Sequence, residues 1–283
     1  MKWSMSTALV VGSLVGCAHP HARLDSLSCV DAIHANAERE LVALKAAAHA
    51  DPRDRDTLIC LAYAQVSLKQ FADAKASATR ALEVDPFDAL ALRLRAFASY
   101  RLGEYQSAER DAERSEREGP IGEAYEICGK SQMRQGKFVT ATRSFERWVG
   151  ADGSTEARCW LAAARWESGD HAAAIAGWDD AARLAPQDPE PWIWKCGFLY
   201  RAGDAKGARD AAAHAHTLAP HSPQVLGAKA RVEVWTGEDA AAKGTLDSLA
   251  RVDPAVATRL AEALAKPAPA ANPAPATSAP ATP

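Results

Sequence analysis

The sequence predicts an all-α protein built from repeated helix pairs. The chain has 283 residues, is rich in alanine and is only 7% aromatic. Small apolar residues let helices pack closely, whereas wide sheets favour β-branched and aromatic residues in alternating runs, which are absent here. A second observation carries the prediction further: three residue types recur with one common period of 33 or 34 residues.

Internal repetition is visible in prolines, alanines and glycines. Gly153 lies 33 residues from both Pro120 and Pro186, at the place where the proline series would continue. Because three series share one period, the middle of the chain is predicted to be an array of units of about 34 residues. The prolines are Pro52, Pro86, Pro120, Pro186, Pro220 and Pro254; the alanines are Ala74, Ala108, Ala141, Ala174, Ala208 and Ala242; and the glycines are Gly103, Gly136, Gly169, Gly203 and Gly237.

Each unit is predicted to contain a first helix, a turn, a second helix and a break. The glycine ends the first helix because it adopts a left-handed backbone at little steric cost. The periodic alanine marks the contact between the two helices, and proline cannot continue the second one. A large residue stands near the start of the first helix, except in the fourth unit, which has Arg158: Leu58, Leu92, Tyr125, Trp192 and Leu226.

This pattern resembles the tetratricopeptide repeat (TPR), whose units stack into a right-handed superhelical solenoid. We expect the solenoid over 26–256, with a leading helix at about 26–50 and a capping helix whose end spans 257–266. The leading helix has an apolar stripe with helical spacing, formed by Val30, Ile33, Ala37, Leu41, Leu44 and Ala48. The six units are placed at 55–88, 89–121, 122–154, 155–188, 189–222 and 223–256.

The start of the chain has the pattern of an export signal. Lys2 precedes an apolar run, Ala8 to Val15, that is too short to span a bilayer. Leu14 to Cys17 resemble the lipobox of bacterial lipoproteins, which implies cleavage after residue 16 and acyl chains on Cys17. The alternative is an ordinary signal peptide followed by a chance cysteine. In Gram-negative bacteria, Ala18 in place of Asp would imply the outer membrane, facing the periplasm.

Other terminal and compositional features bound the function. Residues 17–25 are predicted to be a lipidated N-terminus and short linker, and 267–283, almost all Ala and Pro, a disordered and partly polyproline tail. The net charge is −3, from 33 basic and 36 acidic residues, and becomes −4 if the segment with Lys2 is removed. This charge gives no electrostatic reason to expect a nucleic acid partner.

The TPR resemblance implies that the first helices line a concave groove that binds a partner. Tyr, Trp and Arg dominate binding hot spots, and an aromatic, cationic groove suits an extended or helical peptide with acidic and apolar side chains. In the alternative interpretation, the aromatics half-pack between neighbouring first helices. The positions that the resemblance assigns to the groove hold Tyr63, Arg93, Phe97, Tyr100, Arg101, Lys130, Arg134, Trp166, Glu167, Tyr200, Arg201, Arg231 and Trp235.

Cysteines and histidines offer no catalytic or metal-binding pattern. Cys29 and Cys60 fall on neighbouring helices and could form a disulfide in an exported protein, as could Cys159 and Cys196; small-residue packing is the alternative. His214 and His216 lie two residues apart on a helix and so point to different faces. No CxxC, HExxH or GxSxG pattern is present, so we expect no metal, cofactor, catalytic residue or small-molecule substrate.

These features predict a membrane-anchored protein–protein interaction scaffold of the cell envelope whose partner is an envelope protein or peptide. Lipid-anchored TPR proteins of this size resemble the pilotins that help type IV pilus secretins assemble, and also adaptors for periplasmic proteases or cell-wall hydrolases. A passive spacer between lipid and partner is a further alternative. An enzyme is the least favoured class, because no convergent catalytic set is visible.

Overall fold

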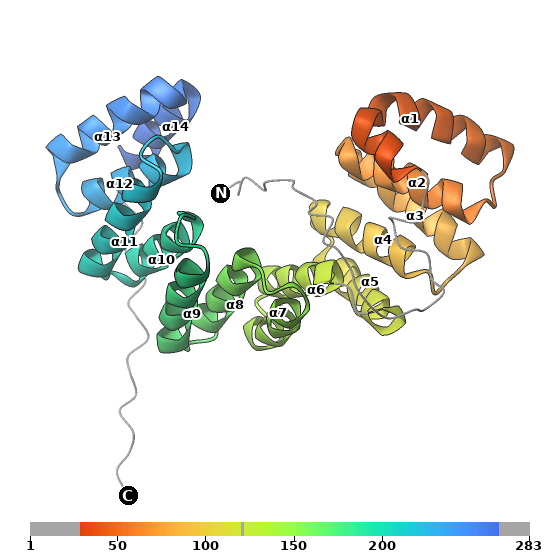
Figure 1. Cartoon of the computed structure of the whole chain (residues 1–283), viewed down its shortest axis with the longest axis horizontal. Coiled ribbons are helices and arrows are strands. Elements are labelled where there is room, and N and C mark those ends of the chain that lie inside the picture. Colours follow the sequence, from red (N-terminus) through yellow and green to blue (C-terminus); the bar gives the residue numbers. More distant parts are fainter. Residues whose placement is uncertain (1–28, 120–121, 266–283) are drawn as a thin grey trace, which may run out of the picture. The chain divides into compact units, whose positions relative to one another are not determined.

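The computed structural model describes residues 29–119 and 122–265. Within these residues there are fourteen helices and no strand, which confirms the all-α prediction (Figure 1). The expected signal peptide, Cys17 and the Ala/Pro tail lie outside the described residues. The helices are α1 (Val30–Ala50), α2 (Arg55–Ser67), α3 (Phe71–Val84), α4 (Ala89–Arg101), α5 (Tyr105–Glu118), α6 (Gly122–Arg134), α7 (Phe138–Asp152), α8 (Thr155–Glu167), α9 (His171–Leu184), α10 (Glu190–Ala202), α11 (Ala205–Leu218), α12 (Pro223–Trp235), α13 (Asp239–Val252) and α14 (Pro254–Leu264).

The helices group into two compact units, where the sequence predicts one continuous array. The first unit contains α1 to α7 and the second α8 to α14, and the chain divides between Gly153 and Ser154. The division falls at the one repeat in which glycine replaces the periodic proline. Gly153 follows α7 with a positive φ of 64°, a conformation that ends a helix at little cost for glycine.

Helix pairs pack through the periodic alanines. All six of these alanines are at most 2% exposed, so the prediction that they mark the contact between the helices of a pair is confirmed. At Gly129 of α6, a β-carbon would lie 2.5–2.8 Å from ring atoms of Phe145 on α7. Phe145 is fully buried, and burying an aromatic side chain of this size stabilises the fold by about 1.5–3 kcal/mol.

The turn between the helices of a pair has a left-handed residue in every unit. The five periodic glycines all have positive φ, between 74° and 95°, as the sequence predicts. The first unit has Lys69 at this position, with φ of 60°. For a residue with a side chain, the left-handed conformation costs roughly 1–2 kcal/mol. The turn geometry is therefore imposed by the packing of the pair and not by glycine alone.

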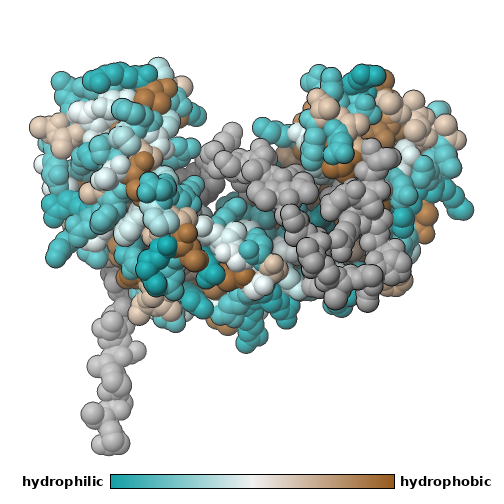
Figure 2. Space-filling model, in the orientation of Figure 1, coloured by the Kyte–Doolittle hydropathy of each residue, from teal (hydrophilic) through white to brown (hydrophobic). Residues whose placement is uncertain are grey.

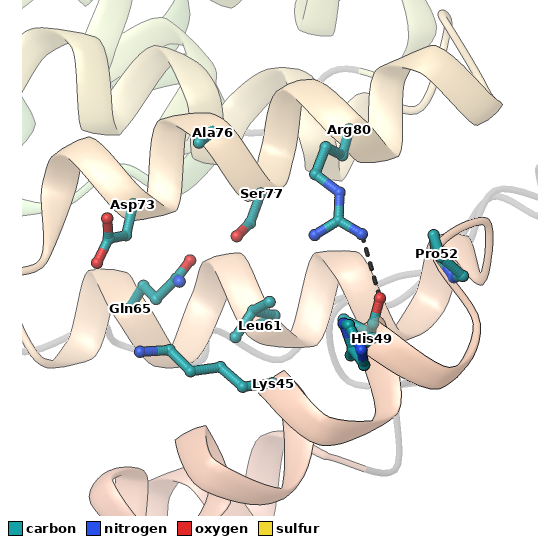
Figure 3. Close-up of a pocket in the computed structure, with 10 residues that line it drawn as sticks. Lys45, His49, Pro52, Leu61, Gln65, Asp73, Ala76, Ser77 and Arg80 are labelled. Carbon is teal, nitrogen blue, oxygen red and sulfur yellow. Dashed lines mark hydrogen bonds between the residues drawn. The ribbon is translucent and has the colours of Figure 1, made fainter.

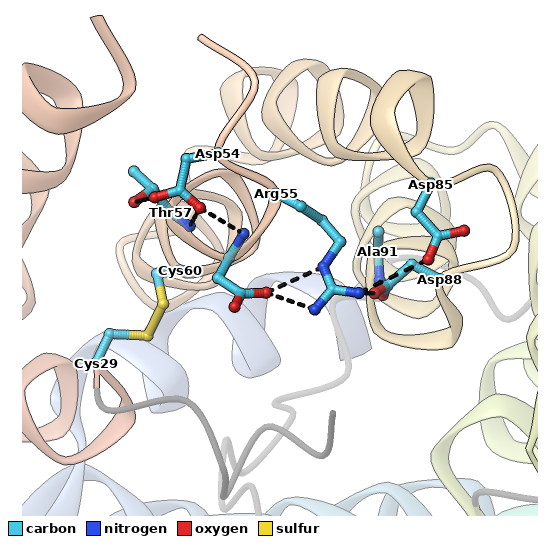
Figure 4. A network of polar contacts seen from close by, with 9 residues as sticks. Cys29, Asp54, Arg55, Thr57, Cys60, Asp85, Asp88 and Ala91 are labelled. Atoms are coloured by element: carbon cyan, nitrogen blue, oxygen red, sulfur yellow. Dashed lines mark hydrogen bonds and ion pairs between the residues drawn. A yellow bond between two sulfur atoms is a disulfide. The ribbon is translucent and has the colours of Figure 1, made fainter. Parts of the chain in front are cut away.

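The starts of α2 and α4 are fixed by acidic caps and by one arginine. Asp54 accepts hydrogen bonds from the backbone N–H groups of Asp56 and Thr57, and Asp88 accepts one from Ala91 at 2.8 Å. Arg55 lies between these two caps, 2.7 Å from Asp56 and 3.4 Å from Asp88 (Figure 4). The start of α2 is thereby tied to the start of α4 in the next repeat.

The leading helix differs from its prediction. It begins at Val30 and is not continuous, because Asn36 has non-helical φ and ψ of −161° and 88°. The short segment before this kink is held against α2: Cys29 forms a disulfide with Cys60 (Figure 4), and Nε2 of His34 lies 2.7 Å from the hydroxyl oxygen of Tyr63. The alternative disulfide between Cys159 and Cys196 is not formed, and both residues are buried free thiols.

The disulfide makes a prediction about stability. It closes a separation of 31 residues, and a bridge of this length stabilises a protein by about 3–4 kcal/mol in the chain-entropy model. Replacing both Cys29 and Cys60 with alanine should therefore lower the melting temperature by about 6–12 °C, as measured by circular dichroism. A reducing agent should lower the melting temperature of the unsubstituted protein to a similar extent and leave that of the double variant unchanged.

Candidate interaction surface

Successive first helices lie side by side within the first unit. Helix α4 contacts both α2 and α6, so side chains at equivalent positions form one face across the three helices. Arg93 of α4 forms an ion pair with Glu123 of α6 across this face. We refer to the side of α2, α4 and α6 that bears Tyr63, Phe97 and Lys130 as the first-helix face.

Tyr63 and Arg93, like Lys130, were predicted to bind a partner but are buried parts of the fold. Tyr63 is 2% exposed and its hydroxyl group is paired with His34. Burial raises the pKa of Tyr63. Arg93 is 8% exposed, and its guanidinium group pairs with the carboxylate of Glu123. The prediction that these side chains line an open groove is therefore corrected, because packing and ion pairing already occupy them.

Arg101 lies over aromatic rings at the end of α4. Its guanidinium carbon is 4.3 Å from the centroid of the Phe71 ring and 5.7 Å from that of Phe97. The two rings contact each other edge to face, with centroids 6.2 Å apart. Within the described residues Arg101 has no carboxylate in an ion pair, so its charge is balanced only by the ring faces.

The same arrangement recurs one repeat later, at the end of α6. The guanidinium carbon of Arg134 lies 5.2 Å from the centroid of the Tyr105 ring, and its Nε donates a hydrogen bond of 3.1 Å to the Tyr105 hydroxyl. Tyr100 contacts Tyr105 with centroids 5.7 Å apart, and burial raises the pKa of Tyr100. We call the two sites, Arg101 with Phe71 and Phe97 and Arg134 with Tyr100 and Tyr105, the arginine–aromatic stacks.

Sequence reasoning missed Phe71 and Tyr105 as members of this surface. Both begin the second helix of a unit, at α3 and α5, while the arginines end the first helix of the following unit. The signal was present in the sequence, because the first residues of four successive second helices are Phe71, Tyr105, Phe138 and His171, at intervals of 34, 33 and 33. The mapping considered only the first helices and therefore excluded them.

The second unit has a denser aromatic surface. Trp166 of α8 stacks on His171 with centroids 4.3 Å apart and lies 5.8 Å from Phe198. Arg201 lies over Phe198 at 4.2 Å and also forms an ion pair of 2.8 Å with Glu167. These half-buried contacts agree with the alternative in which aromatics pack between neighbouring first helices.

The last predicted residues lie on α10 and α12. Tyr200 and Trp235 contact each other edge to face at 5.0 Å, and Arg231 is exposed. The sequence did not predict a second aromatic pair: the rings of Trp192 and His214 stack with centroids 4.5 Å apart. The Nζ of Lys195 lies 5.4 Å from the centroid of the Trp192 ring. The second unit therefore combines aromatic rings with cationic groups as the first unit does.

Ion pairs make the surface less cationic than the sequence predicts. Besides the pairs of Arg93 and Arg201, Lys130 forms an ion pair of 2.6 Å with Glu126, and its side chain is only 4% exposed. Burial of paired charges leaves little net field at these positions. Among the predicted arginines of the described segments, Arg101, Arg134 and Arg231 have no ion-pair partner, and these retain charge for a ligand.

The described residues contain no cluster of three His, Cys, Asp or Glu side chains placed to hold a metal ion. The Gly129-Lys130-Ser131 sequence lies in the interior of α6 and not in a phosphate-binding loop. Burial raises the pKa of Cys128 to about 12 and of Cys196 to about 11, so these thiols are not nucleophiles at neutral pH. No helix of the described part is long and apolar enough to cross a membrane.

Comparison with known proteins identifies the repeats. Residues 61–121 and 129–189 match the tetratricopeptide-repeat family model. The fold is that of a tetratricopeptide-repeat protein. The TPR fold is a scaffold for protein interaction, as the resemblance implies, and it recurs in many solved structures. No curated protein sequence matches the chain.

Three solved TPR structures illustrate the likeness. A TPR protein from Parabacteroides merdae is 18% identical and covers 84% of this chain and 98% of its own, with a TM-score of 0.66. PilF from Pseudomonas aeruginosa is 18% identical; the match covers 75% of this chain and 99% of PilF, with a TM-score of 0.55. YrrB, described as a TPR protein with an unusual peptide-binding site, is 20% identical; the match covers 66% of this chain and 97% of YrrB, with a TM-score of 0.54. These TM-scores show a shared fold.

Burial of the thiols predicts their reactivity. In a Cys17→Ser chain kept oxidised, Cys128, Cys159 and Cys196 should resist alkylation by iodoacetamide at pH 8, because burial raises each pKa and keeps the thiol protonated. Mass spectrometry should find no label on the folded chain and three labels after denaturation. Rapid labelling of any of the three in the folded chain would contradict their burial.

The buried Arg93 and the exposed Arg134 predict effects of different size on stability. Arg93→Ala should destabilise the fold by about 1–3 kcal/mol, because it removes a buried charged hydrogen-bonding partner of Glu123. Arg134→Ala should change stability by less than about 1 kcal/mol, since the Arg134 side chain is exposed. Urea denaturation of the two variants measures the difference. Equal losses would mean that the stack at Arg134 is a structural element like the pair at Arg93.

Proposed function

We propose that the protein is a membrane-anchored interaction scaffold of the cell envelope that binds a peptide or helix of a partner protein on the first-helix face. The observation that carries this proposal is the repetition of the arginine–aromatic stacks. Arg101 and Arg134 occupy equivalent ends of α4 and α6, each over the ring that begins the preceding second helix.

The stacks define the chemistry of the partner. A guanidinium group held over a ring keeps its edge N–H groups for carboxylates, which it binds in a bidentate manner. The rings beside it present apolar area at low cost in conformational entropy. A segment in which acidic and apolar side chains alternate at a spacing that matches the two stacks would satisfy both groups.

Two features of the chain support an envelope location. The Cys29–Cys60 disulfide is of the kind that persists in oxidising compartments such as the periplasm. The Leu14–Cys17 motif ends twelve residues before Cys29 and provides the proposed lipid anchor. An outer-membrane protein facing the periplasm is the location that fits both features and Ala18.

Several roles fit such a scaffold. An assembly factor, with a type IV pilus secretin as one candidate partner, is supported by architecture alone, as is an adaptor for a periplasmic protease or cell-wall hydrolase. A passive spacer would not need the arginine–aromatic stacks. An enzyme is disfavoured because the free thiols of the described residues are buried and these residues contain no cluster of three His, Cys, Asp or Glu side chains that could hold a metal ion.

Partner capture tests the role of the stacks. The Arg101→Ala/Arg134→Ala double variant should lose the partner that the full-length wild-type chain captures from detergent-solubilised envelopes, with at least a tenfold reduction by quantitative mass spectrometry. The matched control is Arg110→Ala/Arg143→Ala, which removes the same charge from exposed positions on α5 and α7. Equal capture by both double variants would reject the stacks as the binding surface.

The identity of the captured protein then discriminates the roles. A secretin would support the pilotin-type assembly factor, and a hydrolase or protease the adaptor. Direct binding must follow with an acidic peptide from the captured protein, measured by fluorescence anisotropy on the purified chain. Binding that is insensitive to replacement of the acidic residues by amides would contradict the proposed recognition chemistry.

A further inference from the structure

On the second-helix side of the first unit, we call the spaces between α1 and α3, between α3 and α5 and between α5 and α7 the first, second and third gaps; the first and third each contain a cavity. Helices α1, α3, α5 and α7 border the gaps, and α2, α4 and α6 form their floors. An arginine of the later helix reaches back in each gap: Arg80 donates a hydrogen bond of 3.2 Å to the carbonyl of Ala48, Arg114 one of 2.9 Å to that of Pro86, and Arg147 one of 3.1 Å to the Glu116 carboxylate.

The second and third gaps are filled by acidic side chains. In the second, Asp111 accepts two hydrogen bonds from Arg95, at 2.7 and 2.8 Å. In the third, Glu116 lies against Arg147 with its side chain only 10% exposed. Burial raises the pKa of Glu116, while Arg147 opposes this rise. In both gaps a carboxylate therefore occupies the space beside the arginines.

The first gap lacks these carboxylates. The position four residues before the periodic proline is Ala48 in the first gap (before Pro52) and Glu116 in the third (before Pro120). Ser77 likewise occupies in its repeat the position that Asp111, 34 residues later in the chain, occupies in the next repeat. The result is an open cavity of about 420 Å³ between α1 and α3, compared with about 140 Å³ between α5 and α7.

Polar groups from three helices face this cavity (Figure 3). Lys45 and His49 reach into it from α1, Asp73, Ser77 and Arg80 line it on α3, and Gln65 forms part of the floor on α2. Arg80 has no ion-pair partner among the described residues, in contrast to Arg147. The formal charges of Lys45, Arg80 and Asp73 sum to 2 − 1 = +1, which matches the charge of one anionic group.

The cavity floor supplies a directed hydrogen-bond donor. Gln65 is 3% and Ser77 5% exposed. With its amide nitrogen turned towards α3, Gln65 donates to the Ser77 hydroxyl oxygen at 2.8 Å and to the backbone carbonyl of Asp73 at 3.1 Å. The Ser77 hydroxyl, whose oxygen then accepts from Gln65, keeps its own proton as a hydrogen-bond donor.

We propose that this cavity binds the carboxylate group of a small ligand or of a peptide side chain, which takes the place that the Glu116 carboxylate fills in the third gap. Arg80 and the Ser77 hydroxyl hold the carboxylate, and Lys45 and His49 close over it from α1. Asp73, two turns of helix before Arg80, accepts from an N–H group of the same ligand. The single net positive charge suits a carboxylate, whereas a phosphate near −2 would be repelled by Asp73.

This site is independent of the proposed partner surface. Leu61 and Gln65 face the cavity, and Tyr63, between them in the chain, points to the opposite side of α2. Failure of carboxylate binding would therefore leave the arginine–aromatic stacks untouched, and failure of partner capture by the stacks would leave the cavity untouched.

Binding to the full chain carrying Cys17→Ser can be measured by nuclear magnetic resonance on ¹⁵N-labelled protein. The probe is N-acetylalanine, which has one carboxylate and one amide N–H; its uncharged amide and inorganic phosphate are the comparison ligands. We expect saturable shifts of α1 and α3 resonances with N-acetylalanine and none with the amide. Equal shifts with the amide, or tighter binding of phosphate, would overturn the carboxylate assignment.

Three variants locate the site. Arg80→Gln should weaken N-acetylalanine binding at least tenfold, and Arg147→Gln, its equivalent in the filled gap, should leave it unchanged. Ala48→Glu supplies the missing carboxylate and should abolish binding without lowering the melting temperature, which separates occupation of the cavity from misfolding. Unchanged binding in both Arg80→Gln and Ala48→Glu would reject the cavity.

The source of the carboxylate is decided by a second ligand. An acetylated, C-terminally amidated tripeptide with a central glutamate presents the group as a side chain. Tighter binding of the tripeptide than of N-acetylalanine would identify an acidic peptide as the ligand class, and tighter binding of N-acetylalanine would identify a small carboxylate. Either ligand is assigned to the cavity only if the Ala48→Glu variant no longer binds it.

Discussion

The close contact between the two helices of each pair is the constraint on which the rest of the structure depends. It requires a residue no larger than alanine at one position of every second helix, and all six such alanines are buried. At Gly129 even a β-carbon would collide with Phe145. Because the helices approach so closely at these positions, larger side chains pack beside the contact or against neighbouring repeats.

The surfaces of the protein follow from this repetition. In two successive repeats of the first unit, the residue at the end of a first helix lies over the residue that begins the preceding second helix. Arg101 and Phe71 occupy these positions in one repeat and Arg134 and Tyr105 in the next, so the same contact forms twice. The face shown in Figure 2 is mainly hydrophilic, with separate apolar patches.

Departures from the repeat carry the most specific information. Lys69 adopts the conformation of the periodic glycine, Gly153 replaces a periodic proline where the two compact units divide, and Ala48 leaves open a gap that Glu116 fills elsewhere. The kink at Asn36 has a comparable effect, because it turns the start of α1 onto α2 and allows the disulfide. In an array of similar units, each departure can be compared with the equivalent position in a neighbouring repeat.

Local sequence alone determined the fold. The period of 33 or 34 residues, the buried alanines and the left-handed turn glycines were predictable because each depends on contacts within one helix pair. The tertiary structure decided which predicted site residues stay accessible: Tyr63 and Arg93 are buried and paired, whereas Arg134 and Arg231 are exposed. It also decided the kink, the ion pairs and the open cavity beside Arg80. These depend on side chains about 30 residues apart meeting across helices, and no spacing rule within one repeat specifies which carboxylate reaches which arginine.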